Sequence, residues 1–267
     1  MKTRVISATV LICLVLACFV LGPYTRVLLL TVAAIFSCHE LCGALANKDI
    51  HCTRYTLFVY IAGISAMSLL KAGAVWYCAW TFLAVVVIIF IGIASRHFGA
   101  RDALASLGVM AYPILPFALI TRLALIGHWA PVFLIACVST WVCDSFALFG
   151  GKRFGRHKLS PTVSPNKTVE GSVCGAVSSL AVGLIAYFVF EKCFGLAAPL
   201  WLCLVTALVA SSIGQVGDLA ASLFKRFAGI KDYSNLIPGH GGALDRTDSL
   251  LFSIPTAYFL FFLAGLV

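Results

Sequence analysis

The chain has 267 residues, of which 61% are hydrophobic and 11% are charged, and its mean hydropathy is +1.03. Soluble domains carry about 25% charged residues, so this composition excludes an ordinary soluble fold and predicts an integral membrane protein. The net charge of +9 would also suit a protein that binds nucleic acid. The placement of the basic residues, described below, argues against nucleic acid as a partner.

The eleven cysteines are scattered through apolar runs, where a cysteine packs as a small hydrophobic side chain. No CxxC pair is present in the sequence, so no disulfide framework is expected. The segment Cys38–Cys42 also holds His39 and Glu40 and leaves a zinc site as a minor alternative. That alternative is disfavoured because the ligands would all lie on one helical segment inside an apolar run.

Nine stretches of the chain are apolar enough to be membrane spans, each of which needs about twenty apolar residues. They are residues 5–21, 26–46, 56–70, 74–94, 104–126, 129–150, 171–190, 198–217 and 249–267. The first stretch follows two basic residues and resembles a signal peptide. Bulky Leu16 beside Ala17 and Cys18 makes a poor cleavage site, so we expect an uncleaved first helix. Pro113 and Pro116 predict a kink in the fifth span.

The basic residues predict the orientation of these spans. In a nine-span chain, most of the 19 lysines and arginines fall on the same side as the N-terminus. The exceptions are Arg26, Lys71, Arg122 and Lys192. We therefore expect an all-α integral membrane protein with about nine transmembrane helices, a cytoplasmic N-terminus and a C-terminus outside. Residues 1–267 would form one polytopic membrane domain, whose long polar loops 151–170 and 218–248 both face the cytoplasm.

The segment 214–249 concentrates chemistry-bearing residues between two apolar stretches. Asp218 ends the eighth predicted span, and if the helix continues, Ser222, Lys225 and Arg226 share its face. This face would present a carboxylate, a hydroxyl and two cations at the membrane surface. The alternative is a plain helix end whose basic side chains extend to lipid headgroups. For these residues taken alone, both interpretations stay open.

Asp245 and Asp248 are spaced i, i+3 at the entry to the last predicted span, and they follow the turn 238–242. Helix capping would explain one of these aspartates but not both. The backbone amides of this glycine-rich turn could face phosphate oxygens. His240 within it could donate to a phosphate, transfer a proton or simply be part of the turn.

Three aspartates are expected at similar depth, because Asp218 lies at one helix end and Asp245 and Asp248 lie at the next. Uncompensated like charges at that depth would destabilise the site. A bound divalent cation resolves this conflict, and carboxylate oxygens completed by phosphate oxygens suit magnesium. We therefore expect Asp218 and Asp245 to bind Mg²⁺, with Asp248 as the third candidate.

A second set of candidates lies around the loop 151–170. Asp144 is near the cytoplasmic end of the sixth predicted span, and an acid within a span is a functional candidate. Most of the basic residues in the loop can be explained by topology alone. The run Ser164–Gly171 is compact, polar and glycine-ended, and Lys167 within it is the expected phosphate contact. Glu40 is another acid within a span, and it could pair with a neighbouring helix.

Two motifs in this order resemble the signature of the phosphatidate cytidylyltransferase family, also called CDP-diacylglycerol synthases. The first motif consists of Asp144, a basic Phe-Gly loop and the run Ser164–Gly171. The second reads S-x-x-K-R, then K-D, then H-G-G-x-x-D-R-x-D, and extends from Ser222 to Asp248. The dipeptide Gly217-Asp218 before it also fits the family. Both motifs have the right spacing, and the multi-span layout resembles the family over the whole length.

The resemblance implies that CTP and phosphatidate give CDP-diacylglycerol and pyrophosphate in phospholipid biosynthesis. It also implies a requirement for Mg²⁺ and leaves open a second cation such as K⁺ and a homodimer. The expected location is the plasma (inner) membrane, with the active site on the cytoplasmic face. The implied catalytic residues are Asp144, Asp218, Asp245 and Asp248. The implied substrate-binding residues are Lys167, Ser222, Lys225, Arg226, Lys231, Asp232, His240, Gly241, Gly242 and Arg246. Ala243 and Leu148 depart from the usual family residues, but both changes are apolar and lie outside the charged set.

Two rival interpretations remain from the sequence. A related CTP-using membrane enzyme, such as a polyprenol kinase or a cytidylyltransferase for an ether lipid, would need similar phosphate-binding groups. A transporter would instead need polar residues at mid-membrane in several spans, whereas here they cluster at the cytoplasmic ends. The chain has neither a P-loop lysine motif nor a GxGxxG motif, so neither common nucleotide cradle is expected.

Overall fold

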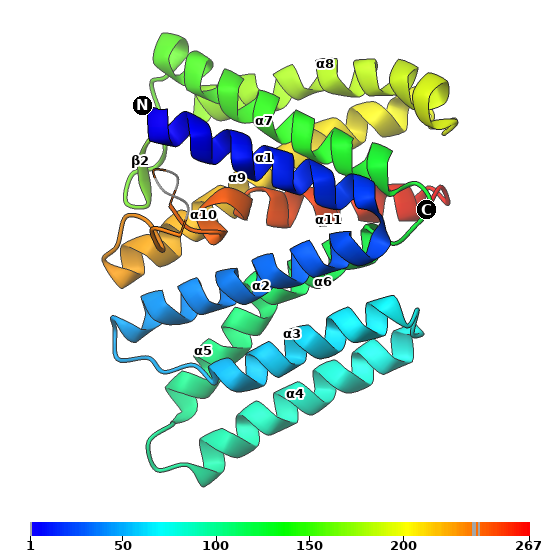
Figure 1. The fold of residues 1–267 in the computed structure, drawn as a ribbon. Coiled ribbons are helices and arrows are strands. Elements are labelled where there is room, and N and C mark those ends of the chain that lie inside the picture. Colours follow the sequence, from blue (N-terminus) through cyan, green and yellow to red (C-terminus); the bar gives the residue numbers. More distant parts are fainter. Residues whose placement is uncertain (1, 237–238, 240) are drawn as a thin grey trace. The chain divides into compact units, whose positions relative to one another are not determined.

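The computed structural model describes residues 2–236, 239 and 241–267 (Figure 1). Helices occupy each of the nine stretches predicted as spans. They are α1 (Lys2–Leu21), α2 (Pro23–Ala46), α3 (Arg54–Leu69), α4 (Ala74–Ala94), α5 (Ala100–Val109), the π-helical segment η1 (Met110–Ile114), α6 (Leu115–Leu123), α7 (Trp129–Phe154), α8 (Val169–Phe194), α9 (Leu200–Ala228), α10 (Leu244–Thr247) and α11 (Leu250–Leu263).

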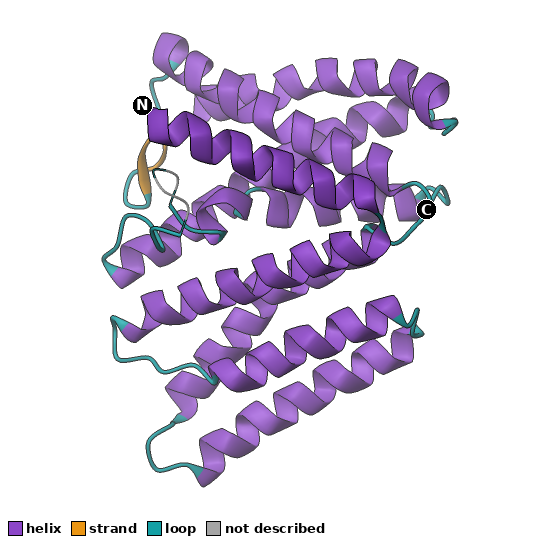
Figure 2. Cartoon of the chain, viewed as in Figure 1, coloured by secondary structure: helices purple, strands orange, loops and turns teal. Residues whose placement is uncertain are grey.

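Among the described residues, six helical stretches are long and apolar enough to cross a membrane, counting α5, η1 and α6 as one. The helices α3 and α11 are apolar but shorter. The all-α, multi-pass prediction therefore agrees with the structure, while the number nine and the orientation of the termini stay predictions. One departure is the hairpin of β1 (Lys158–Ser160) and β2 (Ser164–Thr168), whose antiparallel strands lie within the predicted loop 151–170 (Figure 2).

The kink predicted in the fifth span is confirmed. Tyr112 has φ −143° and ψ 116°, which lie outside the helical region, and it directly precedes Pro113. A proline removes a helical hydrogen-bond donor and clashes with the preceding turn, and it biases the residue before it toward an extended conformation. Pro113 therefore marks the position at which this span is divided into α5 and α6.

The chain forms two compact units. The first unit comprises the chain up to Leu125 together with Phe224–Arg246, and the second comprises Ile126–Leu223 together with Thr247–Val267. The boundary between Leu223 and Phe224 falls within α9, so different parts of this helix belong to different units. Each unit is described by itself below.

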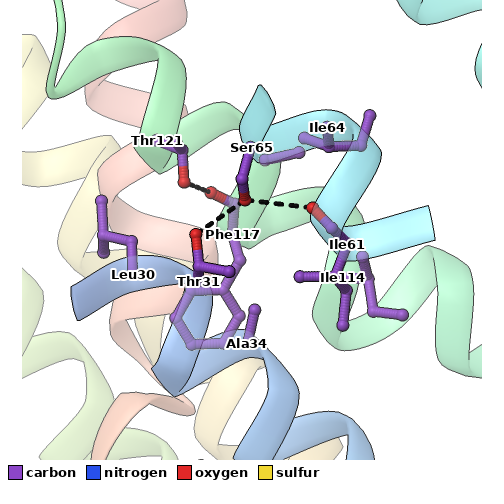
Figure 3. A pocket seen from close by; sticks show the side chains of 10 residues that line it. Leu30, Thr31, Ala34, Ile61, Ile64, Ser65, Ile114, Phe117 and Thr121 are labelled. Carbon is purple, nitrogen blue, oxygen red and sulfur yellow. Dashed lines mark hydrogen bonds between the residues drawn. The ribbon is translucent and has the colours of Figure 1, made fainter. Parts of the chain in front are cut away.

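In the first unit, α2, α3 and α6 pack around a small cluster of hydroxyl groups (Figure 3). The Thr31 and Ser65 hydroxyl oxygens lie 2.7 Å apart, and the Thr121 hydroxyl donates to the Phe117 carbonyl oxygen at 2.8 Å. The cavity beside them is about 10 Å³, which is at the lower limit for one water molecule. The Thr31–Ser65 contact joins α2 to α3, whereas the Thr121 hydroxyl is satisfied within α6.

In the second unit, α7 and α8 run side by side at very short range, and α11 packs on α7 (Figure 1). A Cβ atom added to Gly175 of α8 would lie 2.5 Å from the Cys143 carbonyl oxygen of α7. Similarly, a Cβ atom on Gly171 would lie 2.6 Å from the Ala147 carbonyl oxygen. Small residues let the backbones of two membrane helices approach closely, so these glycines fix the spacing of α7 and α8.

Candidate active site

A pocket of about 680 Å³ lies in the second unit between the C-terminal half of α7, the β1–β2 hairpin, the start of α8, and α9. Its lining combines both signs of charge. The carboxylates are Asp144 and Asp218, and the basic residues are Lys152, Arg156, Lys158 and Lys167. Cations along the rim can neutralise a polyphosphate, while carboxylates at the same site can bind a divalent cation. This pocket is therefore the candidate active site of the second unit.

The two aspartates of the pocket come from different helices and share one lysine. Lys167 Nζ lies 2.5 Å from Asp218 Oδ2, and both side chains are about 30% exposed. Asp144 interacts electrostatically with both Asp218 and Lys167. Since two nearby carboxylates repel each other, the Lys167 ammonium partly offsets their negative charge. The structure thus brings together three residues that the sequence predicted separately.

Asp218 does not end its helix, because α9 continues to Ala228. The condition set for Ser222, Lys225 and Arg226 is therefore met: these residues follow Asp218 on one continuous helix. The neighbouring Gly217 allows α9 to approach the residues before α11, since a Cβ atom there would lie 2.5 Å from the Asp248 carbonyl oxygen. The Asp248 backbone therefore lies beside α9, close to Asp218, within the second unit.

The hairpin that carries Lys167 is held by Glu170, at the start of α8. The Glu170 carboxylate accepts hydrogen bonds from the Arg156 backbone N–H at 3.0 Å and the His157 backbone N–H at 3.2 Å. It also lies 2.6 Å from His157 Nδ1. These bonds close the loop into a hairpin and orient the strand on which Lys167 lies. Sequence analysis recognised the motif around Glu170 but did not assign this role to it.

Gln215 connects α9 to the other two helices of the pocket. Its side-chain oxygen accepts from the Ser172 hydroxyl at 2.5 Å, and its Nε2 donates to the Cys143 sulfur at 3.1 Å. A buried amide needs partners for both its donor and its acceptor groups, and here α8 and α7 supply them. Sequence reasoning missed Gln215, although a glutamine three residues before Asp218 in an apolar helix was an available signal.

In the first unit, Asp245 binds three donors. Lys225 Nζ donates to Oδ1 at 2.8 Å, and the backbone N–H groups of Tyr233 and Gly242 donate to Oδ2 at 2.9 and 3.0 Å. The Asp245 side chain is only 3% exposed. The bond to Gly242 is the one that an acidic side chain makes in a capping box, in which it reaches back to a backbone N–H three residues earlier. Asp245 therefore organises the loop that precedes α10.

Several other predicted residues of the first unit lie on its surface. Arg226, Lys231, Asp232 and Arg246 have exposed side chains. Gly241 adopts φ +82°, and a Cβ atom there would lie 2.9 Å from Asp245 Oδ2. His240 lies outside the described residues. Asp245 and Asp248 do not share one helix, because α10 ends at Thr247 and α11 begins at Leu250.

The residues of the pocket fit a divalent cation only in part. Among the described residues, no group of three or more histidine, cysteine, aspartate or glutamate side chains lies close enough to hold a metal. Asp144 and Asp218 supply carboxylate oxygens from one pocket, and phosphate oxygens of a substrate would have to complete the shell of Mg²⁺. In Asp245, three of about four lone-pair positions already accept hydrogen bonds, so little capacity remains for a metal.

The chain belongs to the cytidylyltransferase family, whose family model matches residues 2–264. It is similar to a protein of Staphylococcus haemolyticus, with 32% identity over 261 residues that cover 96% of each chain. It is also similar to a Staphylococcus saprophyticus protein, with 40% identity over 61% of this chain and 60% of the relative. A Bacillus subtilis protein shows 47% identity over 47% of this chain and 45% of the relative. These three relatives are named phosphatidate cytidylyltransferase.

Proposed function

We propose that the protein transfers CMP from CTP to phosphatidate, giving CDP-diacylglycerol and pyrophosphate in phospholipid biosynthesis. The proposal rests on one observation above all. In a chain that belongs to the cytidylyltransferase family, Asp144, Asp218 and Lys167 converge on one pocket with a basic rim. The names of the relatives support phosphatidate as the acceptor.

The reaction needs no nucleophile from the protein. A phosphatidate phosphate oxygen attacks the α-phosphorus of CTP, and a new P–O bond forms as the bond to the α,β-bridging oxygen breaks. Pyrophosphate leaves with that electron pair. The protein has to align the two phosphates and to neutralise their charge, which are positioning and electrostatic contributions. A general base is dispensable when the attacking phosphate is already ionised.

The basic residues of the pocket are proposed to bind the triphosphate of CTP. Lys152, Arg156 and Lys158 lie along its lining, and Lys167 lies deeper, next to Asp218. When a polyphosphate enters, the Lys167 ammonium can move from the carboxylate to a phosphate oxygen. Phosphate contacts by Lys225, Arg226, Lys231 and Arg246, and substrate contacts by Ser222, Asp232, His240, Gly241 and Gly242, stay proposals based on the sequence motif.

We propose that the reaction depends on Mg²⁺, which would neutralise charge on the triphosphate and on the leaving pyrophosphate. Asp218 is the ligand that the pocket supports best, with Asp144 beside it. Asp245 and Asp248 stay proposed ligands on the basis of the sequence pattern alone, and Asp245 would have to exchange one of its hydrogen bonds for the metal. A second cation such as K⁺ is proposed on the family resemblance alone.

The membrane arrangement is part of the same proposal. The distribution of lysine and arginine supports nine spans with a cytoplasmic N-terminus and the active site on the cytoplasmic face, where CTP is available. The bacterial relatives support the plasma membrane as the location. A homodimer is proposed on the family resemblance.

The deciding experiment supplies the purified full-length protein with phosphatidate, Mg²⁺ and CTP labelled at the α-phosphorus. Label should appear in the lipid, with release of one pyrophosphate per labelled lipid. A lipid kinase would instead transfer label only from the γ-phosphorus of CTP, and that result would refute the proposal. Asp218→Asn should lower the rate on the order of 10²-fold, as expected when one electrostatic group is lost. Asp49→Asn is the matched control, because Asp49 lies on an exposed turn at φ 54°, a conformation that asparagine tolerates.

A further inference from the structure

Glu40 is a carboxylate buried within a membrane helix. It lies in α2, and the residue is 5% exposed. A buried carboxylate is costly unless hydrogen bonds or opposite charges compensate it. The ion pairs found among the described residues do not include Glu40. The described residues compensate it with hydrogen-bond donors.

Those donors come from one distant segment of the same unit. The Ser234 hydroxyl donates to Glu40 Oε1 at 2.6 Å, and the Ala243 backbone N–H donates to the same oxygen at 2.9 Å. The Leu244 backbone N–H donates to Oε2 at 2.8 Å. The Ser234 hydroxyl in turn accepts from the Leu236 backbone N–H at 3.2 Å. Both carboxylate oxygens thus accept hydrogen bonds. Their donors come from residue 234, before the loop that follows it, and from residues 243 and 244, after that loop.

Gly242 fits the same arrangement. A Cβ atom at this position would collide with both oxygens of the Glu40 carboxylate, so the backbone of the loop passes directly over it. This contact gives a steric reason for glycine at the second position of the Gly241-Gly242 pair. The loop backbone and the Glu40 side chain therefore specify each other's position.

Asp245 also binds the residues on either side of this loop. Asp245 binds Lys225 and the backbone N–H groups of Tyr233 and Gly242. Glu40 binds residues adjacent to these, namely Ser234, Ala243 and Leu244. The two carboxylates thus bind neighbouring residues at both ends of the loop between Ser234 and Gly242. These are residues 233 and 234 before it and residues 242–244 after it. Removing either one leaves backbone N–H groups of the segment that carries the family motif without their acceptor.

We propose that Glu40 is a positioning residue for the transfer reaction. It contacts no substrate, and it acts by fixing the backbone of residues 241–246 and thereby the orientation of Asp245 and Arg246. This inference rests on the proposed function for its kinetic consequence, whereas the hold of Glu40 on the loop is a property of the folded chain. The distinction allows the two ideas to fail separately.

The test compares Glu40→Gln with the wild-type chain in lipid nanodiscs. Glutamine keeps the size of the side chain but has one accepting oxygen, so its NH₂ group would face a backbone N–H. We expect kcat to fall at least tenfold while KM for CTP and phosphatidate changes less than threefold. Hydrogen exchange should become faster in residues 241–246 and stay unchanged in α3 and α4. Glu191→Gln, the same change at an exposed position of α8, is the matched control and should alter neither quantity.

A second variant keeps the test decisive if Glu40→Gln does not fold. Ser234→Ala removes one donor to Glu40 and should give a smaller loss of kcat with faster exchange in the same residues. Combined with Glu40→Gln, it should add little further loss, because both changes break one network. A folded Glu40→Gln chain with kcat within twofold of wild type overturns the proposal. A loss of kcat without faster hydrogen exchange in residues 241–246 also overturns it. If the Glu40→Gln chain does not fold, a Ser234→Ala chain with wild-type kcat and wild-type exchange overturns the proposal. A wild-type chain without transferase activity refutes the proposed function, while the exchange data still decide whether Glu40 holds the loop.

Discussion

The spacing of α7 and α8 should control catalysis more strongly than it controls stability, and Gly175→Ala tests this expectation. The added Cβ atom would lie 2.5 Å from the Cys143 carbonyl oxygen and 3.0 Å from both the Ala147 Cβ and the Cys143 sulfur. The first distance is roughly 1 Å shorter than a normal van der Waals separation. The atom that it meets belongs to the backbone, so α7 itself has to move. Asp144 directly follows Cys143 and would move with it.

The expected magnitudes follow from this geometry. Overpacking costs about 1–3 kcal/mol, and replacing glycine by alanine within a helix returns about 1 kcal/mol. The net loss of stability should therefore be small, at roughly 0–2 kcal/mol. A displacement of about 1 Å at a catalytic group can lower the rate on the order of 10²-fold. We expect Gly175→Ala to remain folded and to lose most of its transferase activity.

The assay combines thermal stability in detergent with the rate of CDP-diacylglycerol formation. Gly108→Ala is the matched control, because the same methyl group at Gly108 of α5 would meet no atom within 4 Å. This control should keep wild-type activity and equal or higher stability. If Gly175→Ala keeps wild-type turnover, whatever its stability, the close approach of α7 and α8 does not position Asp144 and the reasoning is wrong.

Three further predictions concern the charged residues. Lys167→Ala should lower kcat/KM for CTP on the order of 10²-fold, because it removes the cation that offsets the charge of Asp218. A wild-type kcat/KM in steady-state kinetics would contradict this role. Asp245→Asn should destabilise the first unit by about 3–5 kcal/mol, because the Lys225 ammonium, whose side chain is 15% exposed, loses its buried partner. Adding Lys225→Met should recover part of that loss in a thermal unfolding assay, and a strictly additive loss would argue against the ion pair. Chelation should abolish label transfer and added Mg²⁺ should restore it, with Asp218→Asn requiring at least tenfold more Mg²⁺ for half-maximal rate. An unchanged Mg²⁺ requirement in that variant would remove Asp218 from the metal site.

The long helices could be predicted from the sequence because each contains an apolar run of about the length of a membrane span, whereas the four-residue helix α10 has no such run. The kink at Tyr112 could also be predicted, since proline restricts the residue before it. The β1–β2 hairpin could not be predicted, because Lys158–Ser160 is only three residues long and Ser164–Thr168 has no alternation of apolar and polar residues. The bonds to Glu170 supply the missing constraint.

Residue identity predicted which residues form the candidate site better than it predicted which groups bind their side chains. Asp144, Lys167 and Asp218 were recognised as separate candidates, and the structure places them in one pocket. The backbone donors to Asp245 and Glu40 could not be predicted, because every residue except proline carries a backbone N–H group. A carboxylate that binds backbone groups leaves no complementary charge in the sequence to reveal its partner.

The contact between Glu40 and Leu244 also has a consequence for biosynthesis, because the two residues are 204 positions apart. At a synthesis rate of about 5–20 residues per second, roughly 10–40 s pass between the translation of α2 and that of its partners. During that interval the ribosome-bound chain holds an acid in an apolar helix with no donors to compensate it. Insertion of α2 therefore precedes the synthesis of the groups that compensate Glu40, and this carboxylate gains its hydrogen-bond donors only when the end of the chain emerges.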